Sequence, residues 1–103
     1  MVTSLHGIDI PRAEIARFCE RNRIRKLSLF GSILTDRFRP DSDVDVLVEF
    51  EPGAPVTFLD VARMEQELAQ AIGRKVDLRT PADLSRYFRD RVVGEALAQY
   101  ERE

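Results

Sequence analysis

The chain has 103 residues, which is the size of one domain and too short for a catalytic domain plus a separate substrate-recognition domain. Charged residues make up 33% of it, yet the formal net charge is only -2, so we expect neither a nucleic-acid coat protein nor a membrane-surface peptide, and no direct nucleic-acid binding. The single cysteine cannot form an internal disulfide, which fits a reducing cytoplasm. No signal peptide or membrane-spanning run is visible, so a cytoplasmic domain over residues 1–103 is the expectation.

Hydrophobic periodicity and turn residues predict the elements of this domain. In chain order they are a frayed tail (1–7), a helix (about 9–22), a short buried strand (27–30), a glycine-serine turn (31–32), a short helix (33–38), a loop (40–42), a strand (43–50), a break (52–55), a long helix (57–72), a strand (75–79), a capped helical turn (80–83) and a last helix (about 89–100).

Two of these elements have especially regular patterns. In the strand over 43–50, apolar side chains alternate with other residues, which places the two groups on opposite faces. The helix over 57–72 shows a predicted core stripe made of Phe58, Val61, Ala62, Leu68, Ala69 and Ile72, and Gly73 ends it as a left-handed cap. The whole order predicts an α/β (α+β) fold, a small mixed β-sheet flanked by helices.

A carboxylate pair heads the strand over 43–50. Asp43 and Asp45 are two residues apart, so they share one face of the strand and lie roughly 6.5 to 7 Å apart. Their mutual repulsion is relieved by a divalent cation, and oxygen ligands favour Mg²⁺ or Mn²⁺. Asp77, which points outward from its own predicted strand, is the candidate third carboxylate for two metal ions and for accepting a proton.

A glycine-serine turn lies ten residues before this pair. Gly31 has no side chain, so its backbone can approach a phosphate closely, and Ser32 adds a hydroxyl donor. Arg37 and Arg39 in the following loop are candidate phosphate contacts. Each feature also has an ordinary interpretation: a plain turn, solvent-facing or capping aspartates, and surface arginines. Their ordered combination favours a metal-assisted reaction on a nucleoside triphosphate.

These residues resemble a known family. Gly31-Ser32, ten further residues and Asp43-x-Asp45 are similar to the signature of the DNA polymerase beta nucleotidyltransferase superfamily. The run from Phe30 to Val48 and the stretch Leu84–Phe88 resemble its smallest members, the minimal nucleotidyltransferase (MNT) antitoxins. One stretch departs from that pattern: residues 33–36 lack the arginine and glycine of many relatives, and Asp36 adds an acid there.

The resemblance implies a polymerase beta-like nucleotidyltransferase fold and a function. It implies that the protein binds ATP and Mg²⁺, with two ions expected, and that it is an antitoxin that adds AMP to a tyrosine of a HEPN-domain ribonuclease toxin. Gly31 and Ser32 then bind the triphosphate, and the carboxylates of Asp43, Asp45 and Asp77 bind the metals. Two alternatives stay open: an antitoxin that neutralises its toxin by binding alone, and a nucleotidyltransferase with a small-molecule acceptor. A homo-oligomer is also possible.

Overall fold

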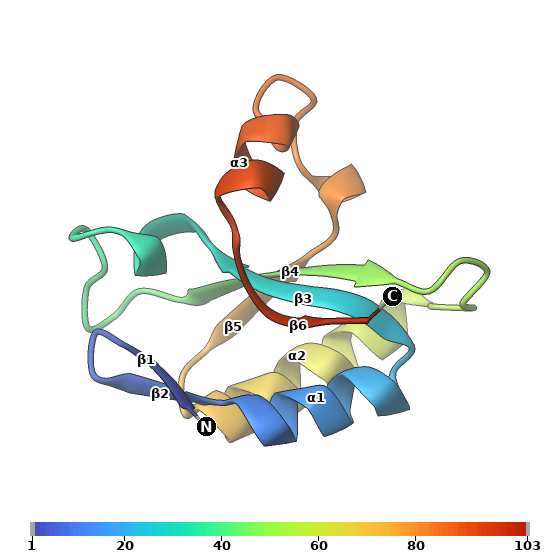
Figure 1. Ribbon diagram of the computed structural model, residues 1–103, viewed down its shortest axis with the longest axis horizontal. Helices are drawn as coiled ribbons and strands as arrows, with labels where there is room; N and C mark the ends of the chain where they lie inside the picture. The colour runs from blue at the N-terminus through green and yellow to red at the C-terminus, as the bar shows by residue number, and fades with distance from the viewer. Residues whose placement is uncertain (1, 103) are drawn as a thin grey trace.

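A four-stranded mixed sheet forms the centre of the molecule. The computed structural model describes residues 2–102. The strand order is β5-β4-β3-β6, with β4 (Val44–Phe50) and β5 (Val76–Arg79) parallel and the other neighbours, β3 (Ile24–Phe30) and β6 (Leu97–Glu101), antiparallel. Helices α1 (Arg12–Arg21) and α2 (Phe58–Ile72) cover one face of the sheet (Figure 1). The predicted mixed sheet flanked by helices is therefore confirmed.

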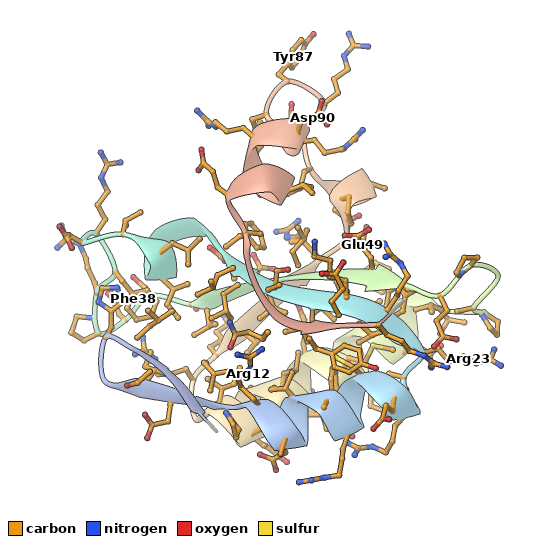
Figure 2. All side chains as sticks on the ribbon, in the orientation of Figure 1. Arg12, Arg23, Phe38, Glu49, Tyr87 and Asp90 are labelled. Carbon is orange, nitrogen blue, oxygen red and sulfur yellow. The ribbon has the colours of Figure 1, made fainter. Side chains whose placement is uncertain are left out.

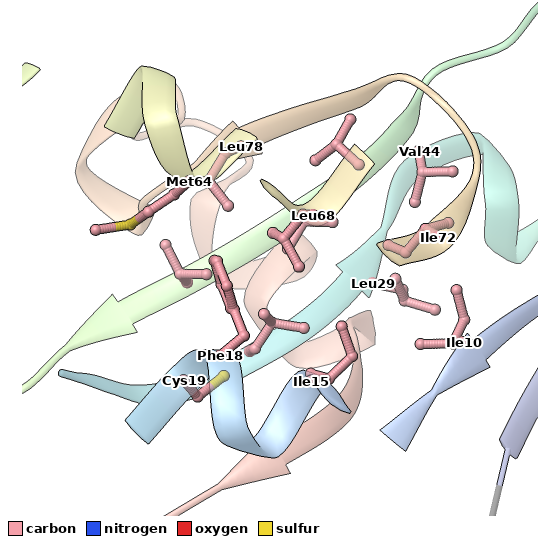
Figure 3. Close-up of a cluster of buried hydrophobic side chains, with 14 of the residues drawn as sticks. Ile10, Ile15, Phe18, Cys19, Leu29, Val44, Met64, Leu68, Ile72 and Leu78 are labelled. Atoms are coloured by element: carbon pink, nitrogen blue, oxygen red, sulfur yellow. The ribbon is translucent and has the colours of Figure 1, made fainter. Parts of the chain in front are cut away.

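The sheet face that packs on the helices contains the main core. Val44, Val46 and Val48 of β4 are fully buried on this face, as their alternation with acidic residues predicted. They pack with Leu27 and Leu29 of the neighbouring strand and with the apolar side of α1, which includes Ile15, Phe18 and Cys19 (Figure 3). Burial raises the pKa of the Cys19 thiol to about 12, with Glu20 adding to the effect, so Cys19 is a core residue.

Helix α2 begins and ends where its sequence predicts. Thr57 is the N-cap, and it exchanges hydrogen bonds with Asp60 in a capping box, while Gly73 ends the helix with a φ of 81°. The predicted core stripe is wrong at its first turn. Phe58 is 91% exposed and Ala62 is also exposed, because the buried side of the helix runs through Met64, Leu68 and Ile72.

The predicted frayed tail at residues 1–7 is wrong within the described residues. β1 (Val2–Leu5) pairs with β2 (Ile8–Pro11) as an antiparallel hairpin, with a turn at His6 and Gly7, both of which have positive φ. Ile8 and Ile10 of β2 are buried in the core, which anchors the hairpin to the domain. Helix α1 therefore begins at Arg12, after a strand, with Pro11 as its N-cap residue.

The predicted last helix over about 89–100 is only half correct. Helix α3 (Arg89–Glu95) ends after seven residues, and the chain continues as β6, which pairs with β3. The backbone of β6 thereby satisfies the donors and acceptors of β3, which an exposed edge would leave unpaired. Within residues 2–102, no helix has the length and apolar character that a bilayer crossing requires.

The segment between β5 and β6 rises from the other face of the sheet (Figure 1). The short 3₁₀ helices of the chain are η1 (Gly31–Leu34) and η2 (Pro81–Asp83), and η2 has the predicted capping box between Thr80 and Asp83. Arg89 of α3 donates to the Pro81 carbonyl at 2.7 Å and to the Leu84 carbonyl at 2.9 Å. These two hydrogen bonds fix α3 to the η2 segment. Helix α3 is therefore held in place above the sheet.

Candidate active site

Two neighbouring strands place carboxylates on the face of the sheet away from α1 and α2. Asp45 of β4 is the register partner of Asp77 of β5, and Asp43 directly precedes β4. Adjacent strands lie about 4.8 Å apart, so the first two side chains extend side by side. The two strands are adjacent, as a role for Asp77 as third carboxylate requires.

The electrostatics of Asp45 reflect this crowding. The pKa of its carboxyl is raised from 3.8 to about 6, first by burial and then by the negative charges of Asp77 and Asp43, while Arg79 lowers it. A carboxylate that is costly to ionise alone gains from a nearby cation. The donors here are carboxylate oxygens, which select a hard divalent ion such as Mg²⁺.

The carboxylates can supply only part of the coordination shell of such an ion. Among residues 2–102, no group of three or more His, Cys, Asp or Glu side chains has the arrangement of a metal cage. Mg²⁺ characteristically binds to one or two carboxylates and completes its shell with water and substrate phosphate oxygens. Asp45 with its acidic neighbours matches that chemistry.

Gly31 lies directly against this carboxylate. Its φ is 77°, a conformation that favours glycine, and a Cβ added there would overlap Oδ2 of Asp45 and lie 3.2 Å from its Cγ. Phe30, the residue before it, is the register partner of Asp45 on β3. The glycine is therefore required by close packing of the turn against the acidic group, which the sequence pattern alone did not indicate.

A cavity of about 660 Å³ opens from this turn toward α3. Its lining is Phe30, Gly31, Ser32, Leu34, Thr35 and Arg37 on one side, and Phe88, Arg91, Val92 and Glu95 on the other. The second group has the spacing of one helical face. The volume lies in the range typical of small-molecule pockets, about 300 to 1,000 Å³. Apolar walls with two guanidinium groups suit a ligand that has both an apolar ring and phosphates.

The predicted phosphate contacts lie in different places. Gly31, Ser32 and Arg37 line the cavity, whereas Arg39 is exposed and is not part of its lining. Asp36, the acid that departs from the family pattern, is likewise exposed and outside the lining. The predicted short helix at 33–38 is replaced by η1 over Gly31–Leu34, in which the Ser32 carbonyl accepts hydrogen bonds from the backbone N–H and the hydroxyl of Thr35.

The loop between η1 and β4 is stabilised by contacts with His6 and Arg74. His6 stacks on Phe38 with ring centroids 5.0 Å apart, and its Nε2 lies 3.0 Å from the Ile33 carbonyl. On the other side the Arg74 guanidinium lies 4.9 Å from the Phe38 ring centroid and donates to the Ser42 carbonyl at 2.6 Å. Figure 2 shows Phe38 at this end of the molecule. These contacts fix the loop that connects the turn to the carboxylates.

Arg79 is a site residue that the sequence analysis missed. Its Nε donates to Oδ1 of Asp77 at 3.1 Å, and its Nη2 donates to Oδ2 at 3.3 Å. The two residues are two apart on β5 and thus share a face, so strand alternation was the signal that pointed to the pair. The carboxylate of Asp77 raises the pKa of Arg79. Asp77 is therefore held in one orientation by a cation from its own strand.

Comparisons with known proteins agree with this geometry. A family model described as a nucleotidyltransferase domain matches residues 13–98. A protein adenylyltransferase of Thermococcus cleftensis is 33% identical over 78 residues, which are 76% of this chain and 77% of that protein. A solved minimal nucleotidyltransferase superimposes with a TM-score of 0.69 and 35% identity over 84% of this chain and 86% of the other. An MNT antitoxin structure in complex with a tri-AMPylated HEPN toxin of Shewanella oneidensis shares the fold, with a TM-score of 0.62 and 22% identity over 87% of this chain and 69% of the other.

Proposed function

The chain belongs to the nucleotidyltransferase domain family, and from this premise we propose that it transfers AMP from ATP to a tyrosine hydroxyl of a HEPN-type ribonuclease toxin, for which it acts as the antitoxin. Support comes from the relative named as a protein adenylyltransferase and from the fold shared with an MNT antitoxin bound to an AMPylated HEPN toxin. On this proposal, residues 1–103 act as one cytoplasmic domain whose acceptor hydroxyl is supplied by the partner protein.

One observation supports this proposal above the others: the contact between Gly31 and the carboxylate of Asp45. Gly31 is part of the wall of the cavity, and Asp45 lies against it beside Asp77. A nucleotide in the cavity would therefore have its phosphates next to the acidic group. Nucleotidyl transfer requires this arrangement, because the phosphorus atom under attack must lie near the groups that stabilise developing charge.

Each proposed role follows from a position. Gly31 and Ser32 bind the triphosphate, and Arg37 contacts its oxygens from the cavity wall. Arg39 remains a prediction as a second phosphate contact. Asp43, Asp45 and Asp77 hold Mg²⁺, which when bound neutralises phosphate charge and makes the attacking hydroxyl more acidic. Asp77, oriented by Arg79, accepts the proton of that hydroxyl.

A second candidate function has one specific observation in its favour. Asp77 is already paired with Arg79, and residues 2–102 contain no ready-made group of three metal ligands. A protein with this arrangement can neutralise its toxin by binding alone. The two candidates make opposite predictions about transfer, so one experiment separates them.

The test combines the purified protein with ATP, Mg²⁺ and a HEPN-type toxin, followed by intact-mass spectrometry of the toxin. We expect the mass to rise by one or more AMP units. The double variant Asp43→Asn/Asp45→Asn is expected to abolish the increase, while the exposed Asp36→Asn is expected to retain it. Absence of transfer by the wild type, together with full protection of cells by the double variant, would instead establish the binding-only function.

A further inference from the structure

The carboxylates lie between two hollows of different character. One is the cavity between η1 and α3. The other is a smaller groove of about 310 Å³, whose walls are Phe58, Val61 and Ala62 of α2 and Asp83 of η2, and whose floor includes Asp77 and Leu78 of β5. Gly31 lines the cavity and touches Asp45, and Asp77 lines the groove. Because Asp45 and Asp77 are register partners, one member of the acidic pair adjoins the lining of the cavity and the other lines the groove.

The charges of the two hollows are opposite. The cavity is lined by two guanidinium groups, Arg37 and Arg91, and by one carboxylate, Glu95. The groove is lined by the carboxylates of Glu65, Asp77 and Asp83 and by one guanidinium, Arg79. Triphosphate is strongly anionic, so electrostatic complementarity directs it to the cavity and away from the groove. The groove is thus left for the second substrate, and it favours one without negative charge.

Apolar side chains extend the groove onto the surface. Phe58 is 91% exposed and Leu59 is 80% exposed, although both lie in the first turn of a well-capped helix. The capping box of Thr57 and Asp60 holds this turn in place, so the two side chains are presented on a rigid support. Neighbouring large apolar residues on a rigid surface are typical of protein-binding sites.

The edge of β5 is not available for an added strand. Leu78 is on the sheet edge, and its backbone N–H donates to Oε2 of Glu65 at 2.8 Å. A partner that binds here must therefore use side chains, and β-augmentation is blocked. The groove offers apolar walls to a ring or an aliphatic chain and ends at Asp77, a hydrogen-bond acceptor for a hydroxyl.

We propose that this groove, with Phe58 in its wall and the exposed Leu59 next to Phe58 in the first turn of α2, is the docking surface for the acceptor segment of a partner protein. The segment has an aromatic or aliphatic side chain that bears a hydroxyl, and basic residues flank it. This inference rests on the proposed transferase function. In the transfer step the acceptor oxygen forms a bond to the α-phosphorus of ATP, the bond from that phosphorus to the pyrophosphate oxygen breaks, and the hydroxyl proton passes to Asp77.

The test uses the double variant Phe58→Ala/Leu59→Ala and measures acceptor binding and transfer separately. Binding of the toxin is measured by calorimetry without nucleotide, ATP binding by the same method, and AMP transfer by steady-state kinetics. We expect the Kd and the KM for the toxin to rise at least tenfold, while ATP binding and the melting temperature stay unchanged because both side chains are exposed.

Two further variants make the test specific. Ala62→Lys, which puts a cation on the groove wall, is expected to weaken toxin binding similarly, because it repels basic flanking residues and fills space. Tyr87→Ala is the matched control: Tyr87 is 84% exposed, lines neither hollow and projects from the loop before α3 (Figure 2). This control is expected to leave every measured constant unchanged.

The outcomes separate this inference from the proposed function. Unchanged toxin affinity and KM in the groove variants would overturn the docking surface, even if AMP transfer by the wild type is normal. Conversely, a wild type that transfers no AMP, yet loses toxin affinity through the groove variants, would overturn the transferase function and keep the docking surface.

Discussion

The two faces of the sheet differ although the same strands build both. On β4, Val44, Val46 and Val48 point toward the helices and are fully buried, whereas Asp45 points to the opposite face beside Asp77. The first face is apolar and close-packed, so each side chain there contributes to stability. The second gathers like charges, and burial together with their repulsion raises the pKa of Asp45 to about 6. The comparison shows that one strand can stabilise the fold through its even positions and hold a destabilising, reactive group at its odd ones.

A substitution on the packed face is expected to have the largest effect on stability. Leu29→Ala removes a fully buried side chain from the core and leaves a cavity, so we expect unfolding to become easier by about 2 to 5 kcal/mol. Leu59→Ala is the matched control because the same atoms are removed from an 80% exposed position, where the change should stay within about 0.5 kcal/mol. Urea denaturation measures both, and equal losses would contradict the close packing of the sheet face that the helices cover.

The next effect concerns the junction between the turn and the acidic face. Gly31→Ala forces a side chain into a positive-φ position and onto the carboxylate of Asp45, so we expect a loss of about 1 to 3 kcal/mol and a loss of nucleotide transfer. Gly73→Ala shares the positive φ, but a Cβ there meets no atom within 4 Å. Thermal unfolding measures the stability of both variants, and the difference between them is the cost of the contact between the new Cβ and Asp45. If Gly31→Ala is no worse than Gly73→Ala, the close contact with Asp45 is not important.

A third prediction concerns the reactive face itself. The pKa of Asp45 is about 6 in the folded protein and ordinarily 3.8, so the folded state binds the proton more tightly than the unfolded chain. The stability that this group contributes is fully present below about pH 4 and is lost as the pH rises through 6. Asp45→Asn, which is always neutral, should therefore raise the melting temperature in the absence of metal at pH 8 and should change it little at pH 4.

The size of that effect is moderate because Asp45 is only partly buried. After a discount for solvent screening, we expect about 1 kcal/mol, or about 4 °C in melting temperature at pH 8. Asp36→Asn, in the exposed part of the loop, is the control and should cause no pH-dependent change. A variant at position 45 that is less stable than the wild type at pH 8 would show that burial and charge repulsion do not make the ionised Asp45 destabilising.

The smallest effect is expected at the ion pair on β5. Arg79→Ala removes the guanidinium that neutralises Asp77, so binding of Mn²⁺ alone should strengthen, because no internal cation competes for the carboxylate. An exposed ion pair holds its partners only weakly, so we expect the Kd to fall by no more than about fivefold. Calorimetric titration with Mn²⁺ measures the change. Weaker binding in the variant would contradict this competition and would mean that the orientation of Asp77 by Arg79 matters more for the metal.

Local patterns predicted much of this protein. The alternation over 43–50, the capped helix over 57–72 and the capping box at Thr80 all depend on residues close in sequence, and each was found as predicted. The candidate carboxylates were also accessible to sequence reasoning, since strand alternation puts Asp45 and Asp77 on the faces opposite to their buried neighbours. Strand alternation and helix capping, which involve only residues close in sequence, are therefore enough to identify these candidate residues.

The wrong predictions share a different cause. Residues 97–101 have an apolar pattern that suits a helix, but they form β6 because β3 offers an edge to pair with. Residues 2–5 form a strand because β2 is anchored in the core. Phe58 lies outside the core because the position of α2 on the sheet selects Met64, Leu68 and Ile72. For residues 97–101 and for Phe58 a partner distant in sequence decided the outcome, and for residues 2–5 the core contacts of the adjoining strand β2 did.

The sequence by itself determined which residues are the candidates for the chemistry: the glycine-serine turn, and Asp43, Asp45 and Asp77. Only the tertiary structure decided how these residues meet. It placed Gly31 against Asp45, paired Asp77 with Arg79 and brought α3 over the turn to form the cavity wall. The physical reason is that alternation and capping act between neighbours in the chain, whereas a close contact between two side chains depends on how whole strands and helices pack.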